Sequence, residues 1–314
     1  MKSIDLTHFI SIKQVQEQYH LQGYQLVDQS VGYDDHIYLL FDQSSLQSNT
    51  KTITYTVVQI AMDWGNMTVE STQLLFTKKL DNNFHFVQPI GQEILLLNAR
   101  CHLYRNKTAE NNAVIVDRLG NIVREMCLGD GIENCIVTDD ARIITSYFDE
   151  GVFGNYGWGN VDSEEPIGSC GLIVWNQYGE IIWKNEHYDI CDCYAMNIDS
   201  KQNLWFYYYT DFELIKTDFK TDIRFSPQVS GAHGFLINPQ QTAILFSGGY
   251  QESCFYEYQI GKEGLENQIK CDILLSGSSS KITGYHFRSS KLLILNEQQR
   301  LYYFDYQTGE SVAQ

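Results

Sequence analysis

The sequence has 314 residues, of which 43% are hydrophobic and 13% aromatic, and this excludes the aromatic-poor composition of a disordered chain. Its 39 acidic and 22 basic residues give a formal net charge of −17, and no Lys/Arg-rich run offsets it. Because nucleic acids and anionic membranes attract basic surfaces, we expect neither as a partner of this acidic protein.

The N-terminal stretch lacks the apolar segment of a secretion signal, and no run approaches the ~18 apolar residues of a membrane helix. The eight cysteines show neither a CxxC motif nor the spacing of a disulfide framework. In a chain of this length such cysteines are typical of reduced, mostly buried thiols. We therefore expect a cytoplasmic protein.

Six short apolar or aromatic runs follow one another along the chain. They are rich in β-branched and aromatic residues and are too short for typical helices, as in strands that are covered on both faces. A less strongly apolar, strand-like run precedes each of them, another β-rich run follows it, and a more polar run ends the unit. The six runs lie at residues 36–41, 93–98, 142–148, 203–209, 242–248 and 291–296.

A recurrent turn separates the third and fourth runs. It places a Gly before Asn or Glu, where a positive φ suits a tight hairpin. Clear versions are "MDWGNM" (62–67), "VDRLGNI" (116–122), "WNQYGEI" (175–181) and "YQTGES" (306–311), and looser versions are "TDFKTDI" (217–223) and "IGKEGL" (260–265). Six turns predict six repeats.

A unit of four strands that recurs at about 40 to 60 residues is typical of a propeller blade. We predict an all-β fold, a six-bladed β-propeller of four-stranded antiparallel blades, in a single domain over residues 1–314. Two stacked β-sandwiches are the alternative, but they do not explain the regular order of the runs. Residues 9–15 are expected to complete the last blade and cover its edge. The expected blades span 22–75, 83–130, 132–186, 190–229, 231–275 and 281–314.

These units resemble six-bladed propellers of the NHL and lactonase/regucalcin-like superfamily, whose blades carry a D-x-x-G hairpin and a short apolar second strand. The stretch "SYFDEGVFGNYGWG" also resembles uncharacterised bacterial propeller-like proteins. The resemblance covers nearly the whole chain and implies the fold. Lactonase-like members bind a divalent cation such as Ca²⁺ through Glu and Asn/Asp on the channel axis. No residue pattern here matches theirs one by one, so no site residue is carried over.

The segment 148–170, "FDEGVFGNYGWGNVDSEEPIGSC", is predicted as a long loop of the third blade. Loops of about twenty residues are usually functional or disordered, and the aromatic residues favour a folded rim at the channel mouth. Asp149 and Glu150 are the candidate catalytic pair or metal ligands, and Asp192, Glu164 or Glu165 could supply the second carboxylate of a glycosidase. Alternatively, Asp149 accepts backbone N–H bonds and Glu150 lies in solvent.

Several other loops are expected on the same face, where a concave mouth would be the default ligand site. Three histidines near strand starts could line the channel or hold a metal, but their spacing matches no metal motif. Cys191 and Cys193 lie on the same side of an extended chain, which suits a redox pair, a soft metal ion or plain packing. The candidate ligand-binding residues are His85, Arg100, His102, Trp158, Asp192, His233, Tyr285 and His286.

Two functions of different classes fit this pattern. The first is a binding module that presents the face around residues 149–170 to a small molecule or a protein. The second is a metal-dependent hydrolase of the lactonase or glycosidase type, with acids and histidines in the channel and a divalent cation such as Ca²⁺. No G-x-S-x-G motif of a serine nucleophile is present.

Overall fold

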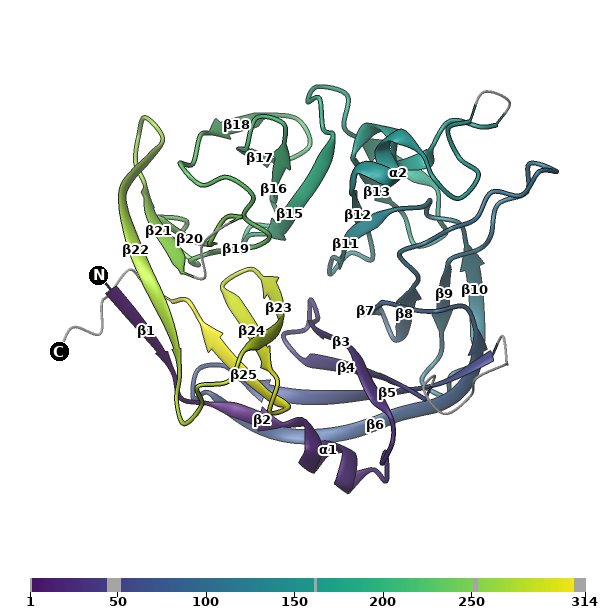
Figure 1. The fold of residues 1–314 in the computed structure, drawn as a ribbon, viewed down its shortest axis with the longest axis horizontal. Coiled ribbons are helices and arrows are strands. Elements are labelled where there is room, and N and C mark those ends of the chain that lie inside the picture. Colours follow the sequence, from purple (N-terminus) through teal and green to yellow (C-terminus); the bar gives the residue numbers. More distant parts are fainter. Residues whose placement is uncertain (1, 44–51, 161–162, 251–253, 308–314) are drawn as a thin grey trace. The chain divides into compact units, whose positions relative to one another are not determined.

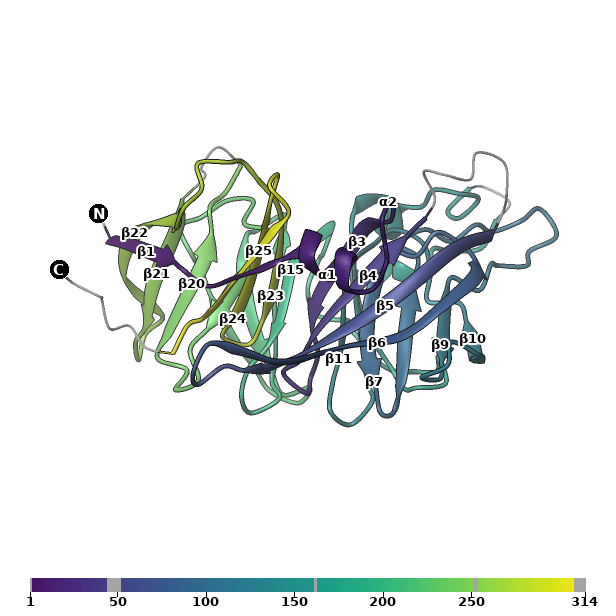
Figure 2. The same ribbon diagram turned by 90° about the horizontal axis from the view of Figure 1, so that it is seen from below.

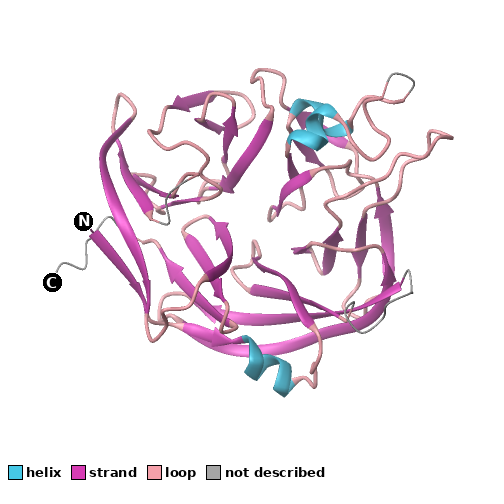
Figure 3. Cartoon of the chain, viewed as in Figure 1, coloured by secondary structure: helices cyan, strands magenta, loops and turns pink. Residues whose placement is uncertain are grey.

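The computed structural model describes residues 2–43, 52–160, 163–250 and 254–307. Strands dominate the regular structure, and the helices are few and short (Figure 3). Within these residues the strands form six sheets, five of four strands and one of five. The predicted fold class, a six-bladed β-propeller of four-stranded antiparallel blades, is confirmed, with one extra parallel strand on the five-stranded sheet. By its contacts the chain divides into two compact units, Val15–Asp192 and Met1–Gln14 with Cys193–Gln314.

The unit Val15–Asp192 holds the first three blades. The first blade contains β3 (Gln25–Val31), β4 (Ile37–Asp42), β5 (Thr52–Asp63) and β6 (Thr68–Asp81). The second contains β7 (Phe86–Ile90), β8 (Glu93–Leu97), β9 (Ala113–Val116) and β10 (Ile122–Met126). The third contains β11 (Ile132–Val137), β12 (Ile143–Tyr147), β13 (Leu172–Trp175) and β14 (Ile181–Lys184).

The other unit holds the remaining three blades. The fourth blade contains β15 (Asp192–Ile198), β16 (Leu204–Tyr209), β17 (Glu213–Thr217) and β18 (Asp222–Phe225). The fifth contains β19 (Phe235–Ile237), β20 (Ala243–Ser247), β21 (Phe255–Ile260), β22 (Leu265–Leu275) and β1 (Lys2–Leu6). The sixth contains β23 (Ile282–Arg288), β24 (Lys291–Asn296), β25 (Arg300–Asp305) and β2 (Phe9–Ser11).

The burial of the strands follows the order of the sequence runs. Every residue of β4, β12 and β24 is buried, whereas β10 and β14 are largely exposed. The second strand of a blade therefore lies between two apolar layers, and the fourth has one face in solvent, which is why the runs change from apolar to polar. Apolar cores fill the space between neighbouring blades, such as the one shared by the second and third blades.

The N-terminal residues depart from the expectation in two places. Phe9–Ser11 pairs antiparallel with β25, but the chain then turns into helix α1 (Ile12–Gln18) rather than continuing as strand to residue 15. In addition, β1 runs parallel to β22 as a fifth strand, which no sequence pattern indicated. The two strands lie side by side in both ribbon views (Figures 1 and 2).

Most hairpin turns use the positive φ that the glycines suggested, as Gly120 and Gly179 do. In the first blade, however, Met67 takes the positive φ and Gly65 does not. The turn at 306–311 lies partly outside the described residues. No helix in the part of the chain that the structure describes is long and apolar enough to cross a membrane. The single domain over residues 1–314 stays a prediction.

Candidate functional site

The loop between β8 and β9, residues 98–112, carries the first part of the site. Its base is closed by the buried amide of Asn112, which donates to the backbone oxygens of Asn98 and Gly129, both at 2.8 Å, and accepts the Leu128 N–H at 2.8 Å. Because every polar atom of this amide is hydrogen-bonded, it holds the two ends of the loop at fixed positions.

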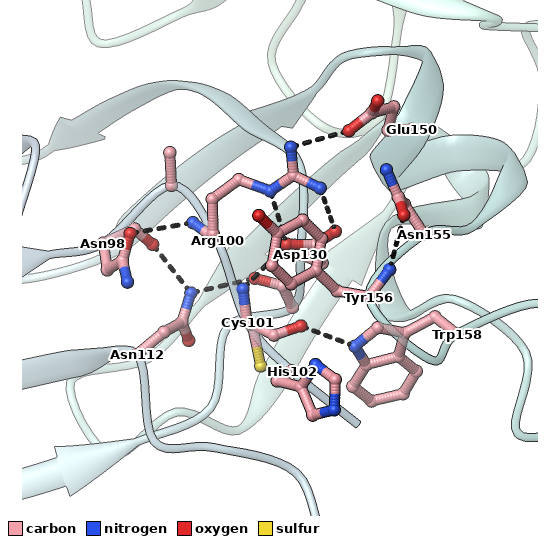
Figure 4. Close-up of polar contacts among 12 residues, drawn as sticks. Asn98, Arg100, Cys101, His102, Asn112, Asp130, Glu150, Asn155, Tyr156 and Trp158 are labelled. Atoms are coloured by element: carbon pink, nitrogen blue, oxygen red, sulfur yellow. Dashed lines mark hydrogen bonds and ion pairs between the residues drawn. The ribbon is translucent and has the colours of Figure 1, made fainter. Parts of the chain in front are cut away.

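Arg100 joins this loop to two other segments (Figure 4). Its Nε and Nη2 donate to the two carboxylate oxygens of Asp130, each at 2.9 Å, and Nη1 lies 2.6 Å from Glu150 Oε2. Asp130 is 2% exposed and also accepts the Cys101 N–H at 2.7 Å. A two-point Arg–carboxylate pair fixes orientation as well as distance, so the side chain has little freedom.

Two aromatic rings complete the surroundings of Arg100. Its Cζ lies 4.2 Å from the centre of the Tyr156 ring and 5.4 Å from that of Phe148, within cation–π range. Burial disfavours the charge, but hydrogen bonds to Asp130 and Glu150 prevail and raise the pKa of Arg100. Arg100 was predicted to bind ligand, and this stays a prediction. In the structure its positive charge is paired with the carboxylates of Asp130 and Glu150, so the side chain holds the surrounding loops in position.

The residues after β12 form a helix rather than the irregular loop that was expected. Helix α2 spans Asp149–Phe153, and η2 spans Ile167–Cys170. Gly131, with φ +69°, lies directly under the helix, and a Cβ there would be 2.3 Å from Gly151 N. Only glycine at these two positions lets the backbones approach so closely. The glycine after the two acids is therefore a packing requirement of α2.

Asp149 and Glu150 have different partners. The Asp149 carboxylate accepts the Glu150 N–H at 2.7 Å, as the backbone-bonding alternative anticipated. Glu150 does not simply lie in solvent, because it pairs with Arg100. A hydrogen bond with Asn155 and the Arg100 guanidinium lower the pKa of Glu150, so its carboxylate stays ionised.

Trp158 anchors the segment that follows α2. Its side chain is 6% exposed, and its indole N–H donates to the Cys101 carbonyl at 2.9 Å. It packs with Cys101 and Leu103, and Cys127 and Ile167 lie against the same small cluster. The ring faces the interior because its apolar surface and N–H are both satisfied there, and the role of Trp158 in ligand binding stays a prediction.

A cavity of about 700 Å³ opens beside this cluster. We call it the loop pocket, and its lining residues come from the β8–β9 loop and from the segment after α2. His102, the predicted ligand residue, has its ring centroid 4.7 Å from that of Tyr104 and 6.1 Å from that of Tyr156. The lining residues are His102, Leu103, Tyr104, Arg105, Lys107, Gly157, Asn160 and Ser163.

His85 lies just before β7, close to Arg100 but outside the lining of the loop pocket. Its Nδ1 accepts the Ala99 N–H at 3.3 Å, and its Nε2 lies 3.3 Å from the Asn83 side chain. Burial lowers the pKa of His85, and the nearby Arg100 charge adds to the effect. Both ring nitrogens of His85 thus have a neighbour within the protein, and its role in ligand binding stays a prediction.

Asp192, at the start of β15, lies within electrostatic reach of two other carboxylates, Glu133 on β11 and Asp149 on α2. Burial, and then the negative charges of Glu133 and Asp149, raise the pKa of Asp192 to about 7. Burial also raises the pKa of Glu133. Asp192 thus changes its charge near neutral pH.

This shift predicts a pH-dependent effect of Asp192→Asn. The folded protein holds the Asp192 proton more tightly than the unfolded chain, so the resulting stabilisation is complete below pH 4 and is lost as the pH rises through about 7. At pH 8 the melting temperature of the variant should be about 2–4 °C above that of wild type, and the difference is this small because solvent screens a half-exposed group. At pH 4 the two melting temperatures should be equal. Melting curves at both values, with the exposed Asp189→Asn as control, check this; an equal gain at both pH values would contradict it.

The remaining predicted residues belong to the other unit. The rings of His233 and Tyr285 lie 5.9 Å apart, and burial raises the pKa of Tyr285. His286 follows on β23 and is half-buried. That these side chains share one mouth with Arg100 and His102 stays a prediction.

Sequence reasoning missed Asp130, the main partner of Arg100, and the role of Tyr156. The signal for Asp130 in the sequence is an acid between two glycines, "GDG" at 129–131. Sequence reasoning also missed Arg105 and Lys107, which are exposed and carry no motif.

In the described part of the chain, no three His, Cys, Asp or Glu side chains are grouped so that they could hold a metal ion.

Comparison with solved structures supports the fold. Hsv2 from Kluyvelomyces marxianus, a propeller, matches with a TM-score of 0.50 and 9% identity over 91% of this chain and 77% of that chain. A chain of the mitotic checkpoint complex matches with a TM-score of 0.52 and 8% identity, over 98% of this chain and 94% of that chain. At sequence identities this low, the structural similarity shows a shared fold and nothing more. No family model matches the sequence, and no curated protein matches it either.

Proposed function

We propose that this protein is a binding module whose loop pocket receives an anionic group of a small molecule or a protein partner. The observation that carries the proposal is the charge of the pocket: Arg105, Lys107 and His102 line it, and its described lining residues include no carboxylate. In a protein of net charge −17, Arg105 and Lys107 concentrate positive charge at this cavity, with the carboxylates of Glu164 and Glu110 bonded to its lining residues.

The charges at the pocket are open to a ligand. Lys107 is paired with Glu164 at 2.8 Å, but both side chains are more than half exposed. Such exposed pairs contribute about 0–1 kcal/mol, so an incoming anion can replace Glu164 at small cost. Tyr104 and His102 add flat ring surfaces, which suit a ligand that carries an aromatic or planar group beside its anion.

The walls of the pocket are held from behind. Leu103 N donates to the Tyr156 carbonyl at 2.9 Å, so the β8–β9 loop and the segment after α2 are joined through their backbones. Trp158 attaches the same two segments through the Cys101 carbonyl, and Arg100 connects the β8–β9 loop to Glu150 of α2. A surface that is ordered before binding loses less conformational entropy on binding, which favours affinity.

The propeller fold is consistent with this role. The structural neighbour from the mitotic checkpoint complex is a chain of a protein assembly, which supports a protein partner for the present chain. Fold likeness alone does not assign a partner, so the argument rests on the loop pocket.

The test is a charge reversal at the pocket. Wild type, Arg105→Glu/Lys107→Glu and the matched control Lys79→Glu/Lys184→Glu are titrated with inorganic phosphate, a nucleoside monophosphate and a tyrosine-containing acidic peptide. We expect at least one probe to bind wild type and control alike, and to bind the pocket variant about tenfold more weakly or worse, because two charge-assisted contacts are lost. If no probe binds, or if binding survives the reversal, the proposal is wrong.

The second candidate is the hydrolase, favoured by one observation. Asp149 and Asp192 are electrostatically coupled carboxylates, and a carboxyl group with a pKa of about 7 is suited to act as a general acid. The same titration series therefore includes chromogenic lactones and glycosides, with and without Ca²⁺. Turnover by wild type that is lost in Asp192→Asn would favour this candidate over the binding module.

A further inference from the structure

Two cysteines from different segments meet behind the loop pocket. Cys101 lies in the β8–β9 loop, Cys127 directly follows β10, and their sulfur atoms are 3.5 Å apart. All eight cysteines are thiols in this structure. Cys101 is fully buried and Cys127 half-buried, and both contact the cluster of Leu103 and Trp158.

We propose that Cys101 and Cys127 form a reversible disulfide when the protein meets a peroxide, and that this pair is an oxidation site of the chain. Two sulfurs at van der Waals distance need to approach by only about 1.5 Å to reach the length of an S–S bond. The residues are far apart in the sequence, so a link between them would close a long loop and restrict the unfolded chain.

The chemistry proceeds in two balanced steps. The Cys127 sulfur attacks one oxygen of hydrogen peroxide, the O–O bond breaks, and the products are a Cys127 sulfenic acid and one water. The Cys101 sulfur then attacks the Cys127 sulfur, the S–O bond breaks, and a second water leaves with the proton of the Cys101 thiol. Two thiols have lost two electrons and two protons, and one peroxide has been reduced to two waters.

The environment assigns the order of the steps. Cys127 is the more exposed of the two residues, whereas Cys101 is fully buried. Hydrogen bonding between the two sulfurs lowers the pKa of Cys127, and the same contact together with burial raises the pKa of Cys101. The sulfur of the more exposed residue is therefore the one that ionises and meets the oxidant, and the sulfur of the buried residue resolves the sulfenic acid.

The disulfide would act on the loop pocket through its backbone. Cys101 stands between Arg100 and His102, its N–H donates to Asp130, and its carbonyl accepts the Trp158 indole. A bond from this residue to the end of β10 would tie the wall of the pocket to the second blade. Oxidation therefore slows hydrogen exchange in the β8–β9 loop.

The experiment treats the folded, fully reduced protein with hydrogen peroxide, alkylates the remaining thiols and maps the peptides without reduction. We expect a peptide pair linked through Cys101 and Cys127, a thiol count that falls from eight to six, and full recovery with dithiothreitol. A disulfide between Cys191 and Cys193 instead, or no disulfide in the folded protein after peroxide treatment, would overturn the assignment. This map uses wild-type protein and needs no variant.

Three variants test the order of the steps. In Cys101→Ser the sulfenic acid on Cys127 has no resolving thiol, so dimedone should label Cys127. In Cys127→Ser no disulfide should form and Cys101 should stay unlabelled. Cys170→Ser removes a thiol that is half-buried like Cys127 and donates to the Leu172 carbonyl at 3.4 Å, and it should oxidise like wild type. Dimedone on Cys101 in the Cys127→Ser protein would show that the assigned order is wrong.

Discussion

Replacing Trp158 by alanine is expected to lower the free energy of unfolding of the unit Val15–Asp192 by about 3–5 kcal/mol, the usual cost of deleting a buried aromatic side chain. The indole is 6% exposed and is the largest side chain in its cluster. Its removal leaves a cavity and also leaves the Cys101 carbonyl without its 2.9 Å hydrogen bond. The segment after α2 should then separate from the β8–β9 loop, and binding at the loop pocket should be lost with it.

Denaturant unfolding and hydrogen exchange measure this effect, and two variants provide the comparison. Trp158→Phe keeps most of the ring packing and loses the hydrogen bond, so it should cost about 1–2 kcal/mol. Trp64→Ala removes the same side chain from a less buried position on the β5–β6 hairpin and should cost less than Trp158→Ala. Equal losses for the two alanine variants would show that Trp158 does not anchor the site.

Replacing Gly131 by alanine should have an effect of similar size for a different reason. The new Cβ would lie 2.3 Å from Gly151 N and 2.4 Å from Gly151 Cα, and backbone atoms cannot move aside as a flexible side chain can. The positive φ of +69° adds about 1–2 kcal/mol for any residue with a Cβ. Together with overpacking of about 1–3 kcal/mol, we expect a loss of about 2–5 kcal/mol.

Gly91 provides the matched control for this variant. Its φ is +57°, but a Cβ there would meet no atom within 4 Å. Gly91→Ala should therefore show only the backbone cost of about 1–2 kcal/mol. If both alanine variants lose the same stability in urea, the contact between Gly131 and α2 contributes nothing. In Gly131→Ala we also expect faster proteolysis of the segment 148–160, because α2 can no longer lie on the turn below it.

Trp158 and Gly131 show how the loop pocket is built from residues that do not hold the ligand. One fills the space behind the pocket wall, and the other allows two backbones to meet. Arg100 also supports the pocket and does not line it, because its guanidinium pairs with two carboxylates and lies against two aromatic rings. A variant in any of these residues is expected to change the position of the wall, whereas a variant in Arg105 changes only the charge presented to a partner.

The order of the strands could be predicted from the sequence because it depends on short-range features. Runs such as 142–148, a polar run at the end of each unit and a glycine hairpin such as that at Gly120 each act within a few residues. Where the local signal was ambiguous, the prediction failed. The hairpin of the first blade places its positive φ at Met67, and the segment after Phe9–Ser11 forms a helix.

The candidate site depended on contacts that no spacing encodes. Arg100, Asp130 and Glu150 come from three segments, and which acid pairs with the arginine is decided when the second and third blades pack. Whether the aromatic rings of the rim face inward or outward follows from the same packing, which buries Trp158 and leaves Tyr156 over the guanidinium. By itself the sequence determined the repeat and the kind of residues near the rim. Only the tertiary structure decided their partners, because long-range pairs depend on the register of segments that are independent in the unfolded chain.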